Sequence, residues 1–214
     1  MARMTGSQNE TARVRLGRGG YLGLGIGAAV FGIAIAIHFG GSSAKPNTGS
    51  ADLIAAAGLV GCPDSGPVAP ASPGLPALRL PCLGAGPAVR LAGLRGVPLV
   101  INVWAGPCPP CKREAPLLQQ FYSENAGRVR LLGVVDGAYP DTVDDALSAA
   151  HGLGMRYSSL FDAHGELADA LHVRGIPVTV FVGASGLIRH IKIGELHAGE
   201  LEQLTATYLG VSIA

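Results

Sequence analysis

Residues 99–112 read LVINVWAGPCPPCK, a run of apolar residues that leads into two cysteines separated by two prolines. The first part, Leu99–Trp104, is nearly all apolar, which is typical of a central strand buried on both faces of a sheet. A helix is expected to follow from Pro109 to Ala126 and to end at Gly127. This order places Cys108 at the helix N-terminus, where unpaired backbone N–H groups and the helix dipole favour a thiolate.

The C-x-x-C spacing of Cys108 and Cys111 has several chemical interpretations. A zinc site needs a second pair of cysteines or histidines at a matching spacing, and no such pair is found. Covalent haem attachment needs a histidine directly after the second cysteine, but that residue is Lys112. A purely structural disulfide across so short a loop would restrict the unfolded chain very little. A redox role without metal or bound cofactor is left, with Cys108 as the attacking thiolate and Cys111 as the resolving thiol.

The two prolines between the cysteines change the environment of the first sulfur. Pro109 and Pro110 fit the first turn of a helix, but neither carries an N–H group that could donate to Cys108. Of the first three helical amides, only that of Cys111 remains. We therefore expect the Cys108 thiolate to be less stabilised than in a C-G-P-C site, which loses only one donor.

The chain from residue 77 to residue 214 predicts one compact α/β domain. Beyond the elements above, it predicts strands at 77–80, 88–91, 129–135, 178–182 and 187–193, and helices from 142, at 166–172 and at 199–208. Alternating strands and helices imply a sheet covered on both faces, with the last two strands forming an antiparallel hairpin. Asp141, Asp144 and Asp145 are interpreted as the solvated start of the helix that Thr142 caps.

The N-terminal region predicts a membrane anchor. Residues 21–39 are apolar or glycine except for His38, a run long enough to cross a bilayer core. Four arginines and a single acid precede it, so the positive-inside rule keeps residues 1–19 in the cytoplasm. We expect a transmembrane helix at residues 20–39 that acts as an uncleaved signal anchor, with cleavage after Ser42–Ala44 as the alternative.

Residues 40–76 are rich in Gly, Ser, Ala and Pro and predict a tether with about one helical turn near its short apolar patch. The domain that follows would then lie outside the cytoplasm, on a single-pass membrane protein. All four cysteines lie beyond the membrane segment, in a compartment where disulfides persist.

Cys62 and Cys82 form a second candidate pair. One interpretation is a structural disulfide that fastens the tether to the edge of the domain. By the chain-entropy model, a loop of 20 residues would then stabilise the fold by roughly 3 kcal/mol. The other interpretation is a second redox pair that exchanges with Cys108. We favour the structural disulfide.

Several motifs together resemble the thioredoxin superfamily. These motifs are Trp104-Ala105-x-x-Cys108-x-Pro110-Cys111-Lys112, Pro116 in the next helix, and Gly175-Ile176-Pro177-Val178-Thr179 before a late strand. Leu94–Ala105 and Gly194-Glu195-Leu196 are more similar to its membrane-anchored TlpA/ResA-like branch. The resemblance covers about residues 75–210 and implies a thioredoxin-like fold, a central mixed sheet flanked by helices. It also implies a cis Pro177 against the disulfide, with Trp104, Ile176 and Pro177 as substrate-binding residues.

The sequence departs from thioredoxin itself in two positions that bear on chemistry. Asn102 stands where thioredoxin has an acid, and an amide cannot take a proton from Cys111. Glu114 matches a carboxylate position of ResA-like proteins and is the candidate base; the alternative is a surface glutamate on the polar face of the helix. Pro107 stands where many relatives carry a tryptophan, which removes an aromatic ring from the rim of the site.

The resemblance implies a thiol-disulfide oxidoreductase whose partners are protein disulfides or dithiols in the cell envelope. Its leading role would be a reductant, for instance of apocytochrome c during cytochrome maturation, recharged by a membrane electron-donor protein. An oxidase for secreted proteins, a peroxiredoxin-type peroxidase and a non-catalytic binding module are the alternatives. The peroxidase would need a threonine shortly before its cysteine, and residues 104–107 contain none. With a net charge of +1 and no Lys/Arg-rich patch, nucleic acid is not expected as a partner.

Overall fold

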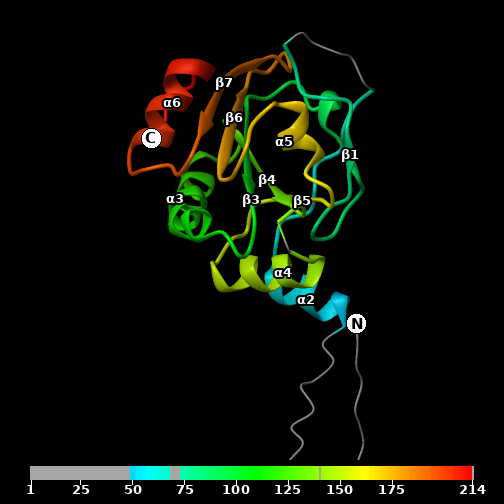
Figure 1. The fold of residues 1–214 in the computed structure, drawn as a ribbon. Coiled ribbons are helices and arrows are strands. Elements are labelled where there is room, and N and C mark those ends of the chain that lie inside the picture. Colours follow the sequence, from blue (N-terminus) through cyan, green and yellow to red (C-terminus); the bar gives the residue numbers. More distant parts are fainter. Residues whose placement is uncertain (1–48, 68–72, 140, 214) are drawn as a thin grey trace, which may run out of the picture. The chain divides into compact units, whose positions relative to one another are not determined.

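The structure, a computed structural model, describes residues 49–67, 73–139 and 141–213 (Figure 1). The cytoplasmic segment 1–19 and the transmembrane helix 20–39 that the sequence predicts lie outside the described residues. Within the described ranges, no helix is long and apolar enough to cross a membrane.

A five-stranded mixed sheet forms the centre of the fold, in the order β5-β4-β3-β6-β7. Its strands are β3 (Leu99–Trp104), β4 (Arg130–Asp136), β5 (Ser159–Asp162), β6 (Val178–Val182) and β7 (Ile188–Ile193). β3 pairs parallel with β4 and antiparallel with β6, so it lies in the middle of the sheet. All six residues of β3 are buried, which explains its apolar sequence. The expected antiparallel final hairpin is confirmed, since β6 and β7 pair in that sense.

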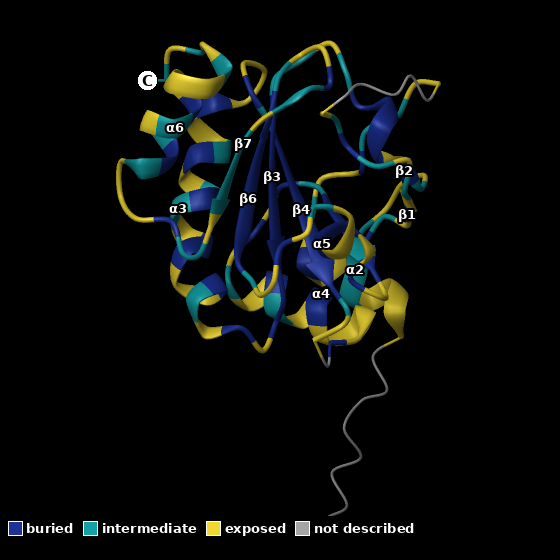
Figure 2. Ribbon diagram, turned by 45° about the horizontal axis from the view of Figure 1, so that its top comes forward, coloured by how far each residue is buried: buried dark blue, intermediate teal, exposed yellow. Residues whose placement is uncertain are grey.

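Helices and a small hairpin cover the two faces of the sheet. Helices α3 (Pro109–Asn125), α4 (Val143–Gly152) and α6 (Glu200–Leu209) contribute to one core cluster. The other cluster takes in the short helices η1 (Leu91–Gly93) and α5 (Glu166–Ala170) and the hairpin of β1 (Arg79–Leu80) and β2 (Val89–Arg90). Figure 2 shows the buried strands between α3 and α6 on one side and α5 and β2 on the other. This is the covered mixed sheet that the sequence predicts.

Part of the segment that the sequence assigns to a tether belongs to the folded unit. Helix α2 (Ser50–Ala57) contacts α4, and Ala57 at its end is completely buried. After it, the Val60 N–H donates to the Arg156 carbonyl at 2.7 Å. The composition of this segment resembles a linker, but Leu53 and Ile54 pack against the core and hold it in place.

Strand β5 is a further element that the sequence analysis did not predict. It has only four residues and ends in Asp162, so neither its length nor its pattern separates it from a loop. The chain at Pro81 and Cys82 covers its outer edge. Cys82 forms an isolated antiparallel β-bridge with Leu160, and the Phe161 N–H donates to the Pro81 carbonyl at 3.0 Å.

Candidate functional site

The two cysteines of the C-P-P-C motif lie at the start of α3 and form a disulfide. Cys108 is the N-cap residue, and its sulfur accepts from the Cys111 N–H at 3.2 Å. Pro109 and Pro110 occupy the first two helical positions, as expected. Both cysteines are buried in the disulfide form. Cys111 therefore supplies the one backbone donor that the sequence leaves to the Cys108 sulfur.

This arrangement predicts the effect of giving the first helical turn another amide. In Pro109→Gly, residue 109 gains an N–H beside Cys108, and hydrogen bonding to a thiolate favours the ionised form. We expect the Cys108 thiolate to form at lower pH in the variant than in the wild type. Ultraviolet absorbance of the thiolate, followed against pH in the reduced protein, measures this. An unchanged titration would show that the missing amide has no influence on the sulfur.

The loop before β6 faces the disulfide. The peptide bond between Ile176 and Pro177 is cis, as the resemblance implies. The Ile176 carbonyl oxygen lies 4.0 Å from the Cys108 sulfur. Ile176 is partly exposed and Pro177 is buried. A polypeptide that approaches Cys108 would therefore pass close to the backbone at Ile176.

Trp104 takes a different position from the one that a substrate-binding residue needs. Its side chain is only 2% exposed and belongs to the core cluster that also contains Cys108 and Cys111. A Cβ atom on Gly133 would come within 3.0 Å of the indole nitrogen, so the neighbouring strand leaves room for the ring. The structure thus places the Trp104 side chain in the core and not on an exposed rim of the site.

Glu114 is buried against the sheet and not on the polar face of α3. One carboxylate oxygen accepts from the Asn102 side-chain amide at 2.7 Å, and the other accepts from the Leu196 N–H at 2.8 Å. Burial raises the pKa of Glu114 to about 7, although these two hydrogen bonds oppose the shift. Because Glu114 lies three residues after Cys111, the two side chains share one face of the helix. The position suits a group that accepts a proton near neutral pH.

The raised pKa of Glu114 predicts a pH-dependent effect on stability. The folded protein binds this proton more tightly than the unfolded chain, so stability falls as pH rises from the ordinary value of 4.5 through about 7. The full shift corresponds to about 3 kcal/mol. In the oxidised protein, the wild type should lose about 2–3 kcal/mol more free energy of unfolding than Glu114→Gln when the pH rises from about 4 to about 8.

Urea denaturation at both pH values measures this difference. The exposed Glu124 at the far end of α3 provides the control, because Glu124→Gln removes the same charge without a buried carboxyl. Parallel pH profiles for Glu114→Gln and the wild type would contradict the assignment.

Asp141 anchors the loop that leads to Cys108, a contact that the sequence analysis missed. The sequence places Asp141 in a solvated turn, but it is buried and its carboxylate accepts from the Gly106 N–H at 2.6 Å. Burial raises its pKa, partly offset by the Gly106 hydrogen bond and by the charge of Lys112. A Cβ atom on residue 106 would lie 3.2 Å from both Asp141 and Ala149, so Gly106 permits this close approach. The expected cap of α4 is confirmed next to it, as Thr142 and Asp145 form a capping box.

Cys62 and Cys82 also form a disulfide. Both contact the core cluster on the opposite face from Cys108 and Cys111. The bond joins the segment after α2 to the loop between β1 and β2. This position favours the structural interpretation of the pair.

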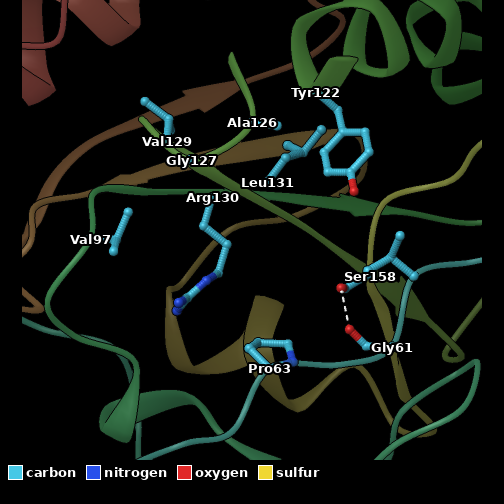
Figure 3. Close-up of a pocket in the computed structure, with 11 residues that line it drawn as sticks. Gly61, Pro63, Val97, Tyr122, Ala126, Gly127, Val129, Arg130, Leu131 and Ser158 are labelled. Carbon is cyan, nitrogen blue, oxygen red and sulfur yellow. Dashed lines mark hydrogen bonds between the residues drawn. The ribbon is translucent and has the colours of Figure 1, made fainter. Parts of the chain in front are cut away.

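An apolar pocket of about 330 Å³ lies away from the dithiol (Figure 3). It is formed where α3 ends and β4 begins, with Tyr122, Val129 and Leu131 in its wall. Arg130 points into the space between Val97 and Pro63 (Figure 3). Because Cys108 and Cys111 lie at the other end of α3, this pocket is separate from the candidate site. Among the residues that the structure describes, no cluster of His, Cys, Asp and Glu could hold a metal ion.

The chain is similar to thiol:disulfide interchange proteins. Over 113 residues the chain is 34% identical to the thiol:disulfide interchange protein DsbE of Vibrio cholerae, covering 52% of this chain and 58% of that one. Over 109 residues it is 33% identical to CycY of Rhizobium leguminosarum, also named a thiol:disulfide interchange protein, covering 50% and 56%. The chain thus spans a little over half the length of these relatives.

A solved structure and a family model show similarity to proteins of the same kind. A secreted disulfide oxidoreductase of Mycobacterium tuberculosis superposes with a TM-score of 0.53 and 25% identity, covering 61% of this chain and 96% of that one. The AhpC/TSA family model matches residues 74–191, which is more than half of the chain and includes both cysteines of the C-P-P-C motif. The chain therefore belongs to the AhpC/TSA family and is a thioredoxin-like protein similar to the TlpA/ResA-like oxidoreductases.

Proposed function

We propose that this protein is an extracytoplasmic thiol-disulfide oxidoreductase that works through Cys108 and Cys111. The observation that carries the proposal is the position of the disulfide. Cys108 caps α3, receives the Cys111 N–H, and lies 4.0 Å from the carbonyl of Ile176 next to the cis proline. The names of the relatives support the same chemistry.

We assign the steps of reduction to particular atoms as follows. In the reduced protein the Cys108 thiolate attacks a substrate disulfide, one substrate sulfur leaves as a thiolate, and a mixed disulfide remains on Cys108. Cys111 then gives its proton to the Glu114 carboxylate and attacks the Cys108 sulfur. The second substrate sulfur leaves as a thiolate, so the substrate gains two electrons while the protein becomes the observed disulfide. One substrate thiolate takes the proton held by Glu114, and the other takes a proton from water, which replaces the one that Cys108 lost on ionisation.

The proposed direction is reduction of envelope disulfides, such as those of apocytochrome c. The Cys108 sulfur has a single amide donor from α3, and a poorly stabilised thiolate makes a less oxidising couple. Similarity to the thiol:disulfide interchange proteins DsbE and CycY supports the exchange chemistry itself. The predicted span at residues 20–39 would hold the domain outside the cytoplasm, and a membrane electron-donor protein would reduce the disulfide again.

Trapping of the substrate tests the proposal. A Cys111→Ser variant of the full chain cannot resolve a mixed disulfide on Cys108, so partners should accumulate as covalent adducts in cell envelopes. We expect cytochrome apoproteins among them, released by dithiothreitol and absent from a Cys108→Ser/Cys111→Ser control. General secreted proteins in their place would favour an oxidase. Absence of any adduct, or oxidation by hydrogen peroxide faster than by disulfides, would contradict the proposal.

A further inference from the structure

A three-residue segment between β7 and α6, Gly194–Leu196, contacts two parts of the site at once. The Gly194 N–H donates to the carbonyl of Pro177 at 2.9 Å. The Leu196 N–H donates to the carboxylate of Glu114 at 2.8 Å. We call this segment the strap. Its first residue therefore holds the cis-proline loop and its last residue holds the buried carboxyl.

The middle residue of the strap is tied to α3. Glu195 receives two hydrogen bonds from the Arg113 Nε, at 3.0 and 3.1 Å, and one from its terminal nitrogen at 2.5 Å. Arg113 directly precedes Glu114, and Glu195 directly precedes Leu196. The ion pair and the Glu114–Leu196 hydrogen bond are thus adjacent ties between the same two segments. Lys192 adds a third contact, from its ammonium to the Glu195 carbonyl at 3.4 Å.

The ion pair lies at the surface. It fixes the orientation of its two groups more than it adds to global stability. The side chain of Arg113 is 61% exposed, and exposed pairs contribute little to global stability. A guanidinium that binds a carboxylate through two nitrogens nevertheless fixes the orientation of both groups. Arg113 also lowers the pKa of Glu195, so the pair stays ionised where Glu114 titrates.

We propose that Arg113 and Glu195 are positioning residues that hold the strap, and through it Glu114 and Pro177, in the geometry needed for disulfide exchange. This inference rests on the proposed function. It predicts that an ion pair on the surface controls proton transfer at the buried resolving cysteine without touching either sulfur.

The groups around Glu114 determine in which direction its pKa should move when the strap is loosened. Glu114 interacts with Asn102 of β3, with Glu195 and the Leu196 N–H of the strap, with Lys192 of β7 and with Tyr157 before β5. Cys111 and Arg113 are its neighbours in sequence on α3, and Thr179 of β6 accepts from Asn102. Burial is the largest cause of the raised pKa of Glu114. A loosened strap admits water, which weakens this largest cause, and it also weakens the Leu196 hydrogen bond, which lowers the pKa. Because burial is the larger of the two effects, the pKa of Glu114 falls toward its ordinary value.

The test follows the resolving step in a single turnover. Reduced full-length protein is mixed with the chromogenic disulfide dithiobis-nitrobenzoate. A first nitrothiobenzoate anion is released when Cys108 attacks, and a second when Cys111 resolves the mixed disulfide. The pH dependence of the second phase should show an inflection that Glu114→Gln removes. In Glu195→Gln and in Arg113→Gln we expect this inflection to lie about one pH unit lower.

Matched controls separate the ion pair from a general effect of charge. Glu124→Gln and Arg128→Gln remove the same charges elsewhere on α3 and in the loop after it, and they should leave the inflection in place. The double variant Arg113→Gln/Glu195→Gln should shift it no further than the single variants do. A structural role alone would lower the thermal stability of these variants without moving the inflection.

Carbon-13 NMR titration of the Glu114 carboxyl gives a second readout that does not depend on exchange. A wild-type inflection in both single variants, or equal shifts in the controls, would overturn the role of the ion pair. So would an inflection that persists in Glu114→Gln. The proposed function would survive these results if both phases of release remain, whereas absence of the first phase would instead refute that function.

Discussion

Cys108→Ser is expected to lose disulfide exchange by at least about 1,000-fold, because the thiolate is the nucleophile and a serine hydroxyl cannot replace it. The position of Cys108 in the structure supports its role as the attacking sulfur. Exposure does not distinguish the cysteines, since Cys108 is 6% and Cys111 is 3% exposed in the disulfide form. Of the two cysteines, Cys108 caps the helix and lies next to the Ile176 carbonyl.

Cys111→Ser provides the contrast for this measurement. It should retain the first phase of release from a chromogenic disulfide at a rate near that of the wild type, and lose the second phase completely. Stopped-flow absorbance on both variants measures the two phases. If Cys111→Ser lost the first phase while Cys108→Ser retained it, the roles of the two sulfurs would be reversed.

Replacement of the other disulfide is expected to lower stability and to leave the chemistry intact. Cys62→Ala/Cys82→Ala should reduce the free energy of unfolding by about 3 kcal/mol, because the bond closes a loop of 20 residues in the unfolded chain. Urea denaturation of the oxidised protein measures the loss. Release from the chromogenic disulfide, measured below the denaturation transition, should proceed at the wild-type rate.

A neighbouring surface substitution serves as the control. Val60 is 48% exposed in the same segment, so Val60→Ala should leave stability nearly unchanged. If Cys62→Ala/Cys82→Ala retained full stability but stopped after a single turnover, the pair would be a second redox pair. The structural interpretation would then be wrong.

The sequence was most informative where one dominant constraint acts on each residue. Burial on both faces makes Leu99–Trp104 apolar, and β3 has these exact bounds. Thr142 and Asp145 lie at capping-box spacing, and the capping box forms. The C-P-P-C motif predicts a helix start with one remaining amide donor, and the Cys111 N–H takes that role. In the capping box and the C-P-P-C motif, local geometry alone determines the outcome.

The misses arise where the environment comes from distant parts of the chain. Nothing near Asp141 indicates that Gly106, 35 residues earlier, donates to it. The sequence left two positions open for Glu114, the candidate base and a surface glutamate, because its partner Leu196 is 82 residues away. Helix α2 looks like linker because its Ala-rich sequence reveals no partner, and α4 provides that partner only after folding. Spacing and composition carry no information about such contacts.

The chain at Pro81 and Cys82 has a consequence for self-association. By lying along the outer side of β5, it uses backbone groups on that edge of the sheet, including the Phe161 N–H. Unpaired strand edges are templates on which a second molecule can add its own strand. The disulfide at Cys82 therefore keeps the covering segment in place, and a reduced Cys62–Cys82 pair would leave the protein more prone to edge-to-edge aggregation.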